Sequence, residues 1–169
     1  MTEPTRALVC TDASVLVNLA ILDGFSLLAA LPAYRFVVPD TARAEVIVAE
    51  QREVLDTALA DGHLTEVTFE TPEELKLFAE LSAQVDPGEA ACLAIAIARD
   101  GFVACDERGA FARITRECLG TDRTFTTPGL ILEAIRAGVI DVKAADECKV
   151  LLEKHRFRMR FASFRDLLP

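Results

Sequence analysis

Short apolar runs alternate with longer amphipathic segments along the whole chain. The short runs have the length of buried strands, and the longer segments begin near an acid or a proline and follow a helical period. These patterns predict strands at 7–11, 35–38, 64–69, 102–105 and 123–126. They predict helices at 15–22, 25–31, 41–60, 73–83, 86–100, 107–119, 128–137 and 143–154. Such alternation predicts an α/β/α sandwich, a central parallel sheet with helices on both faces.

The length and composition are those of one domain. A chain of 169 residues, 51% of them hydrophobic, can build one core under a covered sheet. We see no internal repeat, low-complexity stretch or linker, so we expect 1–169 to form a single domain. In the tail, arginines alternate with Phe157, Met159 and Phe161, and this period of two predicts an edge strand over 156–161.

The apolar runs and the net charge indicate where the protein is located and which partners it can bind. The longest useful apolar run, 90–98, has about half of the roughly 20 residues that a bilayer span needs. The first residues lack the features of a signal peptide, so we expect a cytoplasmic protein with no membrane partner. A net charge of −9 argues against a general nucleic-acid coat. An acidic enzyme can still meet phosphate through bound cations and a local basic strip.

Four acids stand where a parallel sheet usually places its site. Asp12 and Asp106 each follow a predicted strand directly, and ligands of open parallel sheets bind beyond the carboxyl ends of the strands. Glu45 lies about one helical turn after Asp40, and Glu89 lies in the first turn of its helix, so both can reach the same edge. Four carboxylates at one edge would suit Mg²⁺ or Mn²⁺.

Simpler roles are open for each of these acids. Glu45 stands too far inside its predicted helix to cap it, although a surface ion pair with Arg43 or Arg52 is an alternative. Glu89 follows Asp86 by three residues, the spacing of a capping box. Four aspartates are placed to cap helices, namely Asp12, Asp40, Asp86 and Asp106. Spacing alone therefore leaves capping and metal binding both open.

The order of the motifs resembles that of a PIN domain. The opening matches in Val9-Cys10-Thr11-Asp12-Ala13-Ser14, in Val38-Pro39-Asp40 and in Ala44-Glu45-Val46. The Gly-Glu-Ala helix and the acid after the fourth strand match in Gly88-Glu89-Ala90-Ala91 and Val103-Ala104-Cys105-Asp106-Glu107-Arg108. The last strand and helix match at 126–132 and 137–140. The resemblance covers nearly the whole chain and is strongest to a prokaryotic, toxin-like PIN subgroup.

This resemblance implies a Mg²⁺- or Mn²⁺-dependent nuclease. Such proteins are commonly the ribonuclease toxin of a toxin-antitoxin pair, often homodimeric and blocked by a small antitoxin. Ser14 matches the hydroxyl residue two places after the first acid, and Glu107 is either an extra ligand or the first residue of its helix. The acids that hold the metal in the family match Asp12, Glu45, Glu89 and Asp106.

Two departures from the family pattern put the rate of the reaction in doubt. Ala104 stands where many members carry Thr, and Glu89 stands where many carry Asp. We therefore weigh a metal-dependent endoribonuclease that cleaves single-stranded RNA against a catalytically weak or inactive module that binds nucleic acid or regulates. A phosphotransferase with Asp12 as nucleophile is disfavoured, because the sequence has no Asp-x-Asp motif there and no phosphate-binding glycine loop.

Positive charge gathers in the tail, at Lys154, Arg156, Arg158 and Arg160. These side chains could follow a phosphate backbone. The alternative is that the arginines form the solvated face of the predicted edge strand, where charge blocks unwanted strand pairing.

Overall fold

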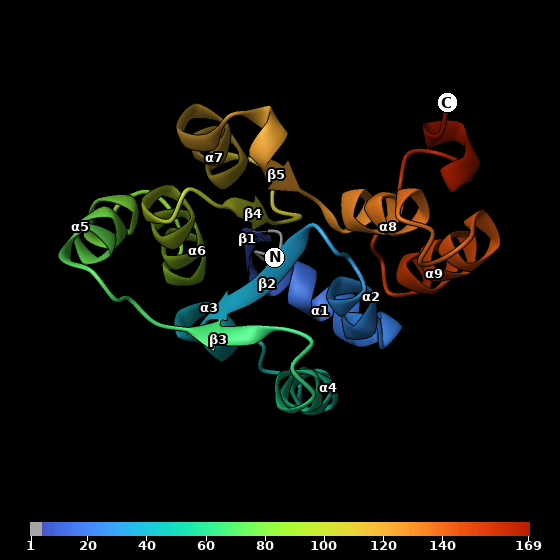
Figure 1. The fold of residues 1–169 in the computed structure, drawn as a ribbon, viewed down its shortest axis with the longest axis horizontal. Coiled ribbons are helices and arrows are strands. Elements are labelled where there is room, and N and C mark those ends of the chain that lie inside the picture. Colours follow the sequence, from blue (N-terminus) through green and yellow to red (C-terminus); the bar gives the residue numbers. More distant parts are fainter. Residues whose placement is uncertain (1–4) are drawn as a thin grey trace.

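Five parallel strands form the central sheet of the protein (Figure 1). The computed structural model describes residues 5–169. The strands are Ala7–Thr11 (β1), Tyr34–Pro39 (β2), Thr65–Val67 (β3), Phe102–Ala104 (β4) and Thr124–Phe125 (β5). Their order is β3-β2-β1-β4-β5, and every neighbouring pair is parallel. The predicted parallel sheet is therefore confirmed.

Helices cover both faces of this sheet, as the sequence predicts (Figure 1). On one face α1 packs against α4, α8 and α9, and α2 packs against α4 and α8. These helices are Ala13–Leu22 (α1), Phe25–Ala29 (α2), Ala49–Ala60 (α4), Thr127–Arg136 (α8) and Val142–Lys154 (α9). On the other face α6 packs against α3, α5 and α7. These are Asp40–Ala44 (α3), Pro72–Leu81 (α5), Pro87–Ala98 (α6) and Ala110–Leu119 (α7).

The two remaining helical pieces are short 3₁₀ turns, Thr121–Arg123 (η1) and Phe164–Leu167 (η2). None of the helices among the described residues is long and apolar enough to cross a bilayer.

The strand order creates a crevice beside β1. The chain passes from β1 outward to β2 and β3, and then returns to place β4 on the opposite side of β1. Connections that leave two neighbouring strands in opposite directions open a crevice beyond their carboxyl ends. Thr11 pairs with Ala104 in this register, so Asp12, one residue further, and Asp106, two residues further, emerge at one edge. The strands that precede the two aspartates, β1 and β4, are therefore neighbours in the sheet.

The predicted helix over 41–60 is wrong, because the chain breaks into α3 and α4. Val46 is buried while Ile47 is 85% exposed, and Val48 has the extended backbone of a helix N-cap. The Arg52 guanidinium donates hydrogen bonds to the carbonyls of Arg43 (2.8 Å) and Val46 (3.0 Å). The bond to Val46 gives a donor to a carbonyl group that the break removes from the helix ladder. Glu45 consequently ends α3 and does not lie inside a long helix.

The helix predicted to start at Glu107 begins later. Gly109 adopts a positive φ of 77° and forms the N-cap of α7, which starts at Ala110. Asp106 and Glu107 thus lie in a loop, and Asp106 does not cap the helix that follows it.

The tail alternates in exposure as predicted, but it forms no strand. Arg158 and its arginine neighbours are exposed, whereas Phe157, Met159 and Phe161 pack on the cluster around Phe164. The backbone instead turns at the end of α9, where Phe157 N–H donates to the Leu152 carbonyl (3.0 Å). Arg156 takes the left-handed φ of 69° that this turn requires. The position favours glycine, and a residue with a long side chain such as arginine costs about 1–2 kcal/mol there.

Candidate acidic site at the sheet edge

Asp12 caps α1 with only one of its two carboxylate oxygens. Its Oδ2 accepts hydrogen bonds from the backbone N–H of Ser14 (3.0 Å) and from the Ser14 hydroxyl (2.7 Å). The cap that the sequence predicted is therefore present. Oδ1 is buried without a hydrogen-bond partner among the described residues, in a side chain that is 2% exposed. A buried carboxylate oxygen without a donor is costly, which makes this atom a natural ligand for a cation.

Asp106 is held by three donors from α1 and α8. Its Oδ1 accepts from the Thr127 backbone N–H (2.7 Å), and its Oδ2 accepts from Asn18 Nδ2 (2.9 Å) and from the Thr127 hydroxyl. Burial raises the pKa of Asp106, and the bonds from Thr127 and Asn18 oppose that rise. The donors therefore favour the ionised carboxylate in a buried place.

Asn18 and Thr127 were not singled out by the sequence analysis. Asn18 is a buried polar residue in an otherwise apolar stretch of α1, and this is the signal that could have marked it. Thr127 follows another Thr at the start of α8, so its local pattern suggests a helix cap. The cap is in fact Thr126, whose hydroxyl accepts from Gly129 N–H.

Ser14 ties the two aspartates together. Its hydroxyl donates to Asp12 and accepts a hydrogen bond from the backbone N–H of Asp106 (3.1 Å). The Cys105 thiol also donates to Asp12 Oδ2, at 3.6 Å. This contact supplies a hydrogen bond to Asp12 although Ala104 has no hydroxyl to offer. Asp12 and Asp106 are thus fixed relative to each other by side chains from both strands' ends.

Glu45 reaches across to the beginning of α6. Its Oε1 accepts from the Gly88 backbone N–H at 2.8 Å. A Cβ atom at position 88 would stand only 2.5 Å from this oxygen, so the carboxylate occupies space that only glycine leaves open. Burial raises the pKa of Glu45; the Gly88 bond opposes this, and the Asp12 charge adds to it.

The alternative that Glu45 forms a surface ion pair with Arg43 or Arg52 is wrong. Arg43 pairs with Asp56 (2.8 Å) and Glu66 (2.6 Å), and the Arg52 guanidinium lies 3.7 Å from Asp56. Neither arginine therefore neutralises Glu45, which lies near Asp12 at the acidic edge.

Glu89 forms the predicted capping box, and the charges of nearby acids also affect its pKa. The Asp86 N–H donates to its side chain at 3.2 Å. Burial raises the pKa of Glu89 to about 7, and the charges of Asp12, Asp86 and Glu107 add to the rise. Capping and membership of the acidic cluster therefore coexist at this residue.

Glu45, Asp106 and Glu107 line an open cavity of about 390 Å³, whereas Asp12 and Glu89 are not among its lining residues. The cavity is lined by Ala13, Ser14, Val17, Asn18, Glu45, Asp106, Glu107 and Phe157. Within residues 5–169, no three His, Cys, Asp or Glu side chains stand at a spacing that would hold a metal ion. The acids face one region without forming a finished ligand set. Their donors are carboxylate oxygens, which are the ligands preferred by Mg²⁺ and Mn²⁺.

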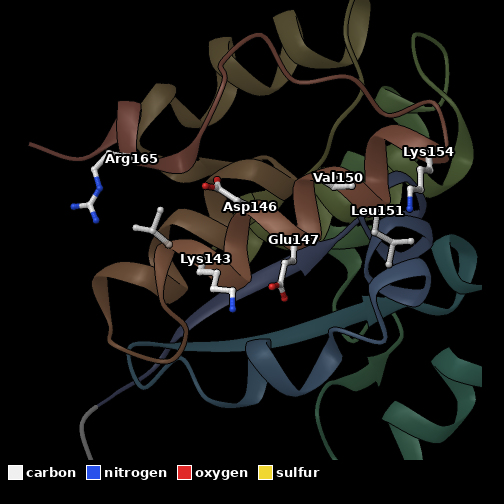
Figure 2. Close-up of a pocket in the computed structure, with 8 residues that line it drawn as sticks. Lys143, Asp146, Glu147, Val150, Leu151, Lys154 and Arg165 are labelled. Carbon is white, nitrogen blue, oxygen red and sulfur yellow. The ribbon is translucent and has the colours of Figure 1, made fainter.

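Three of the four predicted tail cations lie beside the acids. Arg156, Arg158 and Arg160 line a second cavity of about 550 Å³ together with Asp106 and Glu107. Lys154 lines a different cavity on α9, with Lys143, Glu147 and Leu151 among its neighbours (Figure 2).

Comparison with known families agrees with the fold. A family model described as PIN domain matches residues 8–168, a span that includes all four acids and the arginine tail. No curated protein matches the chain.

Proposed function

The chain belongs to the PIN-domain family, and on that premise we propose that it is a divalent-metal-dependent endoribonuclease that cleaves single-stranded RNA. PIN domains are generally nucleases, which makes nucleic acid the expected substrate. The observation that carries the proposal is the buried, unpaired Oδ1 of Asp12 beside Asp106. Such an atom needs a positive partner, and none of the described side chains supplies one.

Asp12, Glu45, Glu89 and Asp106 would hold Mg²⁺ or Mn²⁺, with Glu107 as a possible further ligand. The bound ion would lower the pKa of a coordinated water and stabilise negative charge on the phosphate. In-line attack by water on the phosphodiester would leave 5′-phosphate and 3′-hydroxyl ends.

The remaining residues would position these carboxylates. Thr127 and Asn18 oppose the rise in the pKa of Asp106 that burial causes, and they fix the orientation of its carboxylate. Ser14 sets the relation between Asp12 and Asp106. Fixing the ligands before substrate arrives reduces the reorganisation that the reaction requires.

The proposal is tested by incubating the protein with a defined single-stranded RNA in Mg²⁺, in Mn²⁺ and in EDTA. We expect cleavage in either metal and none in EDTA, with phosphate on the 5′ ends of the products. A folded protein that binds the RNA but leaves it intact in both metals would contradict the proposal. That result would instead favour the catalytically weak or inactive nucleic-acid-binding module, which Ala104 and the unfinished ligand spacing favour as the second candidate.

We further propose a toxin role in the cytoplasm, as a homodimer controlled by a small antitoxin. This rests on the family resemblance and on one surface feature: Ile47 is 85% exposed and Val48 46% exposed, two and three residues after Glu45. A partner that covers these apolar side chains would also cover the acidic edge. Growth arrest on expression, relieved by a neighbouring small gene, tests the toxin role, and size-exclusion chromatography tests the dimer.

Gly88→Ala is expected to weaken both Mn²⁺ binding and RNA cleavage about 10- to 100-fold, the usual effect of losing a group that supports a metal ligand. The new Cβ would displace the Glu45 carboxylate, which lies 2.5 Å from its position. Helix α6 should not lose stability, because alanine is the better helix former by up to about 1 kcal/mol. Calorimetric titration with Mn²⁺ and initial cleavage rates measure the effect.

Gly129→Ala is the matched control for this variant. It also lies in the first turn of a helix after a proline, but its Cβ would meet its nearest neighbour, the Thr126 hydroxyl, at 3.4 Å. We expect nearly unchanged Mn²⁺ affinity. Equal affinities for Gly88→Ala and the parent protein would remove Glu45 from the metal site.

A further inference from the structure

A second cavity adjoins the acidic site and shares three residues with it. Asp106, Glu107 and Phe157 line both the acidic cavity and the neighbouring cavity of about 550 Å³. The rest of the second cavity is formed by Arg108, Thr126, Pro128, Arg156, Arg158, Met159, Arg160 and Phe161. Its volume lies within the roughly 300–1,000 Å³ typical of small-ligand pockets. We call it the tail pocket, because residues 156–161 form one of its walls.

Four arginines line the tail pocket, which is also lined by Asp106 and Glu107. Arg108, Arg156, Arg158 and Arg160 are exposed, and none forms an ion pair with another residue in the range 5–169. The chain as a whole carries a charge of −9. A group of neighbouring cations that form no ion pairs attracts an anionic ligand. The repulsion among their positive charges falls when the phosphates of a polyanion neutralise them.

The pocket also offers apolar surface for a flat ring. Phe157 and Phe161 are partly buried against the cluster around Phe164, so their rings are held in place by packing. Pro128, from the start of α8, also lines the pocket. Aromatic side chains beside arginines form the combination that binds unpaired bases and their phosphates.

The backbone at Arg156 adds an independent indication. This residue occupies the left-handed position that glycine favours, yet an arginine stands there and reaches the pocket. Residues that hold an unfavourable backbone conformation gather at functional sites.

We infer that the tail pocket holds the nucleotide next to the scissile phosphate of a single-stranded RNA. The base would lie against Phe157 and Pro128, and the arginines would contact the flanking phosphates. Since Phe157 belongs to both cavities, a nucleotide seated there brings the neighbouring phosphate to the acids and so fixes the position of the cut. The position of the bound nucleotide next to a cleaved phosphate rests on the proposed ribonuclease function. Binding of RNA in the tail pocket does not depend on that function and can be tested alone.

Binding is measured by fluorescence anisotropy with a labelled 12-nucleotide single-stranded RNA and protein in EDTA, where cleavage cannot occur. The double variant Arg158→Gln, Arg160→Gln should bind at least about tenfold more weakly. The slope of log affinity against log salt should fall by about 1.4, since each phosphate contact with a single strand contributes about 0.7. Phe157→Leu keeps apolar bulk for packing but removes the ring, and should bind about tenfold more weakly.

Arg156→Gly separates binding from folding. It removes a cation at a position where glycine is the favoured residue, so we expect weaker RNA binding together with an unchanged or higher Tm. A change that merely damaged the tail would lower both.

Arg165→Gln and Lys154→Gln are the matched controls. They remove the same charge from the same end of the chain, but both residues line the α9 cavity shown in Figure 2. We expect affinities close to that of the parent protein.

The outcomes distinguish the two proposals. Equal loss of affinity in the controls and in the pocket variants, or no loss in the pocket variants, would overturn the tail pocket. Failure of the parent protein to bind the RNA would overturn it as well. If the pocket variants lose affinity as expected but the parent protein cleaves nothing in Mg²⁺ or Mn²⁺, the pocket stands and the nuclease proposal fails. In an active enzyme, the double variant should raise KM by a larger factor than it lowers kcat.

Discussion

Asp12→Asn is expected to lower metal-dependent RNA cleavage at least about a thousandfold, which corresponds to about 4 kcal/mol of lost transition-state stabilisation. The substitution removes the charge from a carboxylate whose Oδ1 is buried without a hydrogen-bond partner among residues 5–169. Asparagine still offers an oxygen to Ser14 and is as good a helix cap as aspartate, so α1 should form normally. The defect should therefore appear in catalysis and not in folding.

Two measurements separate these effects. Mn²⁺ should raise the Tm of the parent protein by mass action, and should raise that of Asp12→Asn much less. Without metal, Asp12→Asn should melt at or above the parent temperature, because a buried charge facing Glu45 and Glu89 has been removed. Asp106→Asn should show a similar loss of cleavage.

Asp40→Asn is the control for charge alone. Asp40 follows β2 as Asp12 follows β1, but it is exposed and is the first residue of α3; the cap predicted there is in fact Pro39. We expect parent-like cleavage. If Asp12→Asn retained more than about a tenth of the parent rate, Asp12 would not be a metal ligand in the reaction.

Glu74→Ala is expected to lower the free energy of unfolding by about 3–5 kcal/mol, the cost of breaking a buried ion pair from one side. Glu74 is 1% exposed, and Arg99 Nε donates to its Oε1 at 2.6 Å. Its Oε2 also accepts from the N–H groups of Glu70 (2.5 Å) and Thr71 (3.3 Å), which completes the capping box of α5. The variant would loosen the contact between α5 and α6. Urea unfolding measures the change.

The effect should depend on pH with a definite sign. The Arg99 hydrogen bond lowers the pKa of Glu74 below its usual 4.5. The folded state thus favours the carboxylate, and this contribution is complete above about pH 4.5 and lost as the pH falls through the lowered value. The difference between the parent and Glu74→Ala should accordingly shrink in strong acid.

Glu80→Ala provides the control on the same helix. Glu80 is exposed and lies 4.0 Å from Lys76, so its loss should change the free energy of unfolding by no more than about 0.5 kcal/mol. Equal losses from Glu74→Ala and Glu80→Ala would show that the Arg99 pair contributes no more than a surface pair.

The sequence by itself determined the elements that depend on local pattern. The five strands and the order of the helices follow from apolar runs and helical periods, which are properties of neighbouring residues. Asp12 and Asp106 could be assigned to one sheet edge because each directly follows a predicted strand, and the carboxyl ends of parallel strands lie at the same edge. The capping box of Asp86 and Glu89 was likewise readable from a spacing of three.

Only the tertiary structure decided which groups meet across long separations. Gly88 as the partner of Glu45 and Thr127 as the partner of Asp106 are contacts between different elements, and no local periodicity encodes them. The tail, residues 156–161, is another segment whose structure depends on contacts with distant residues. Its period of two reports one buried and one exposed side, but a strand also needs a neighbour for its backbone hydrogen bonds. The turn after α9 and packing on Phe164 instead carry the arginines to the acidic edge.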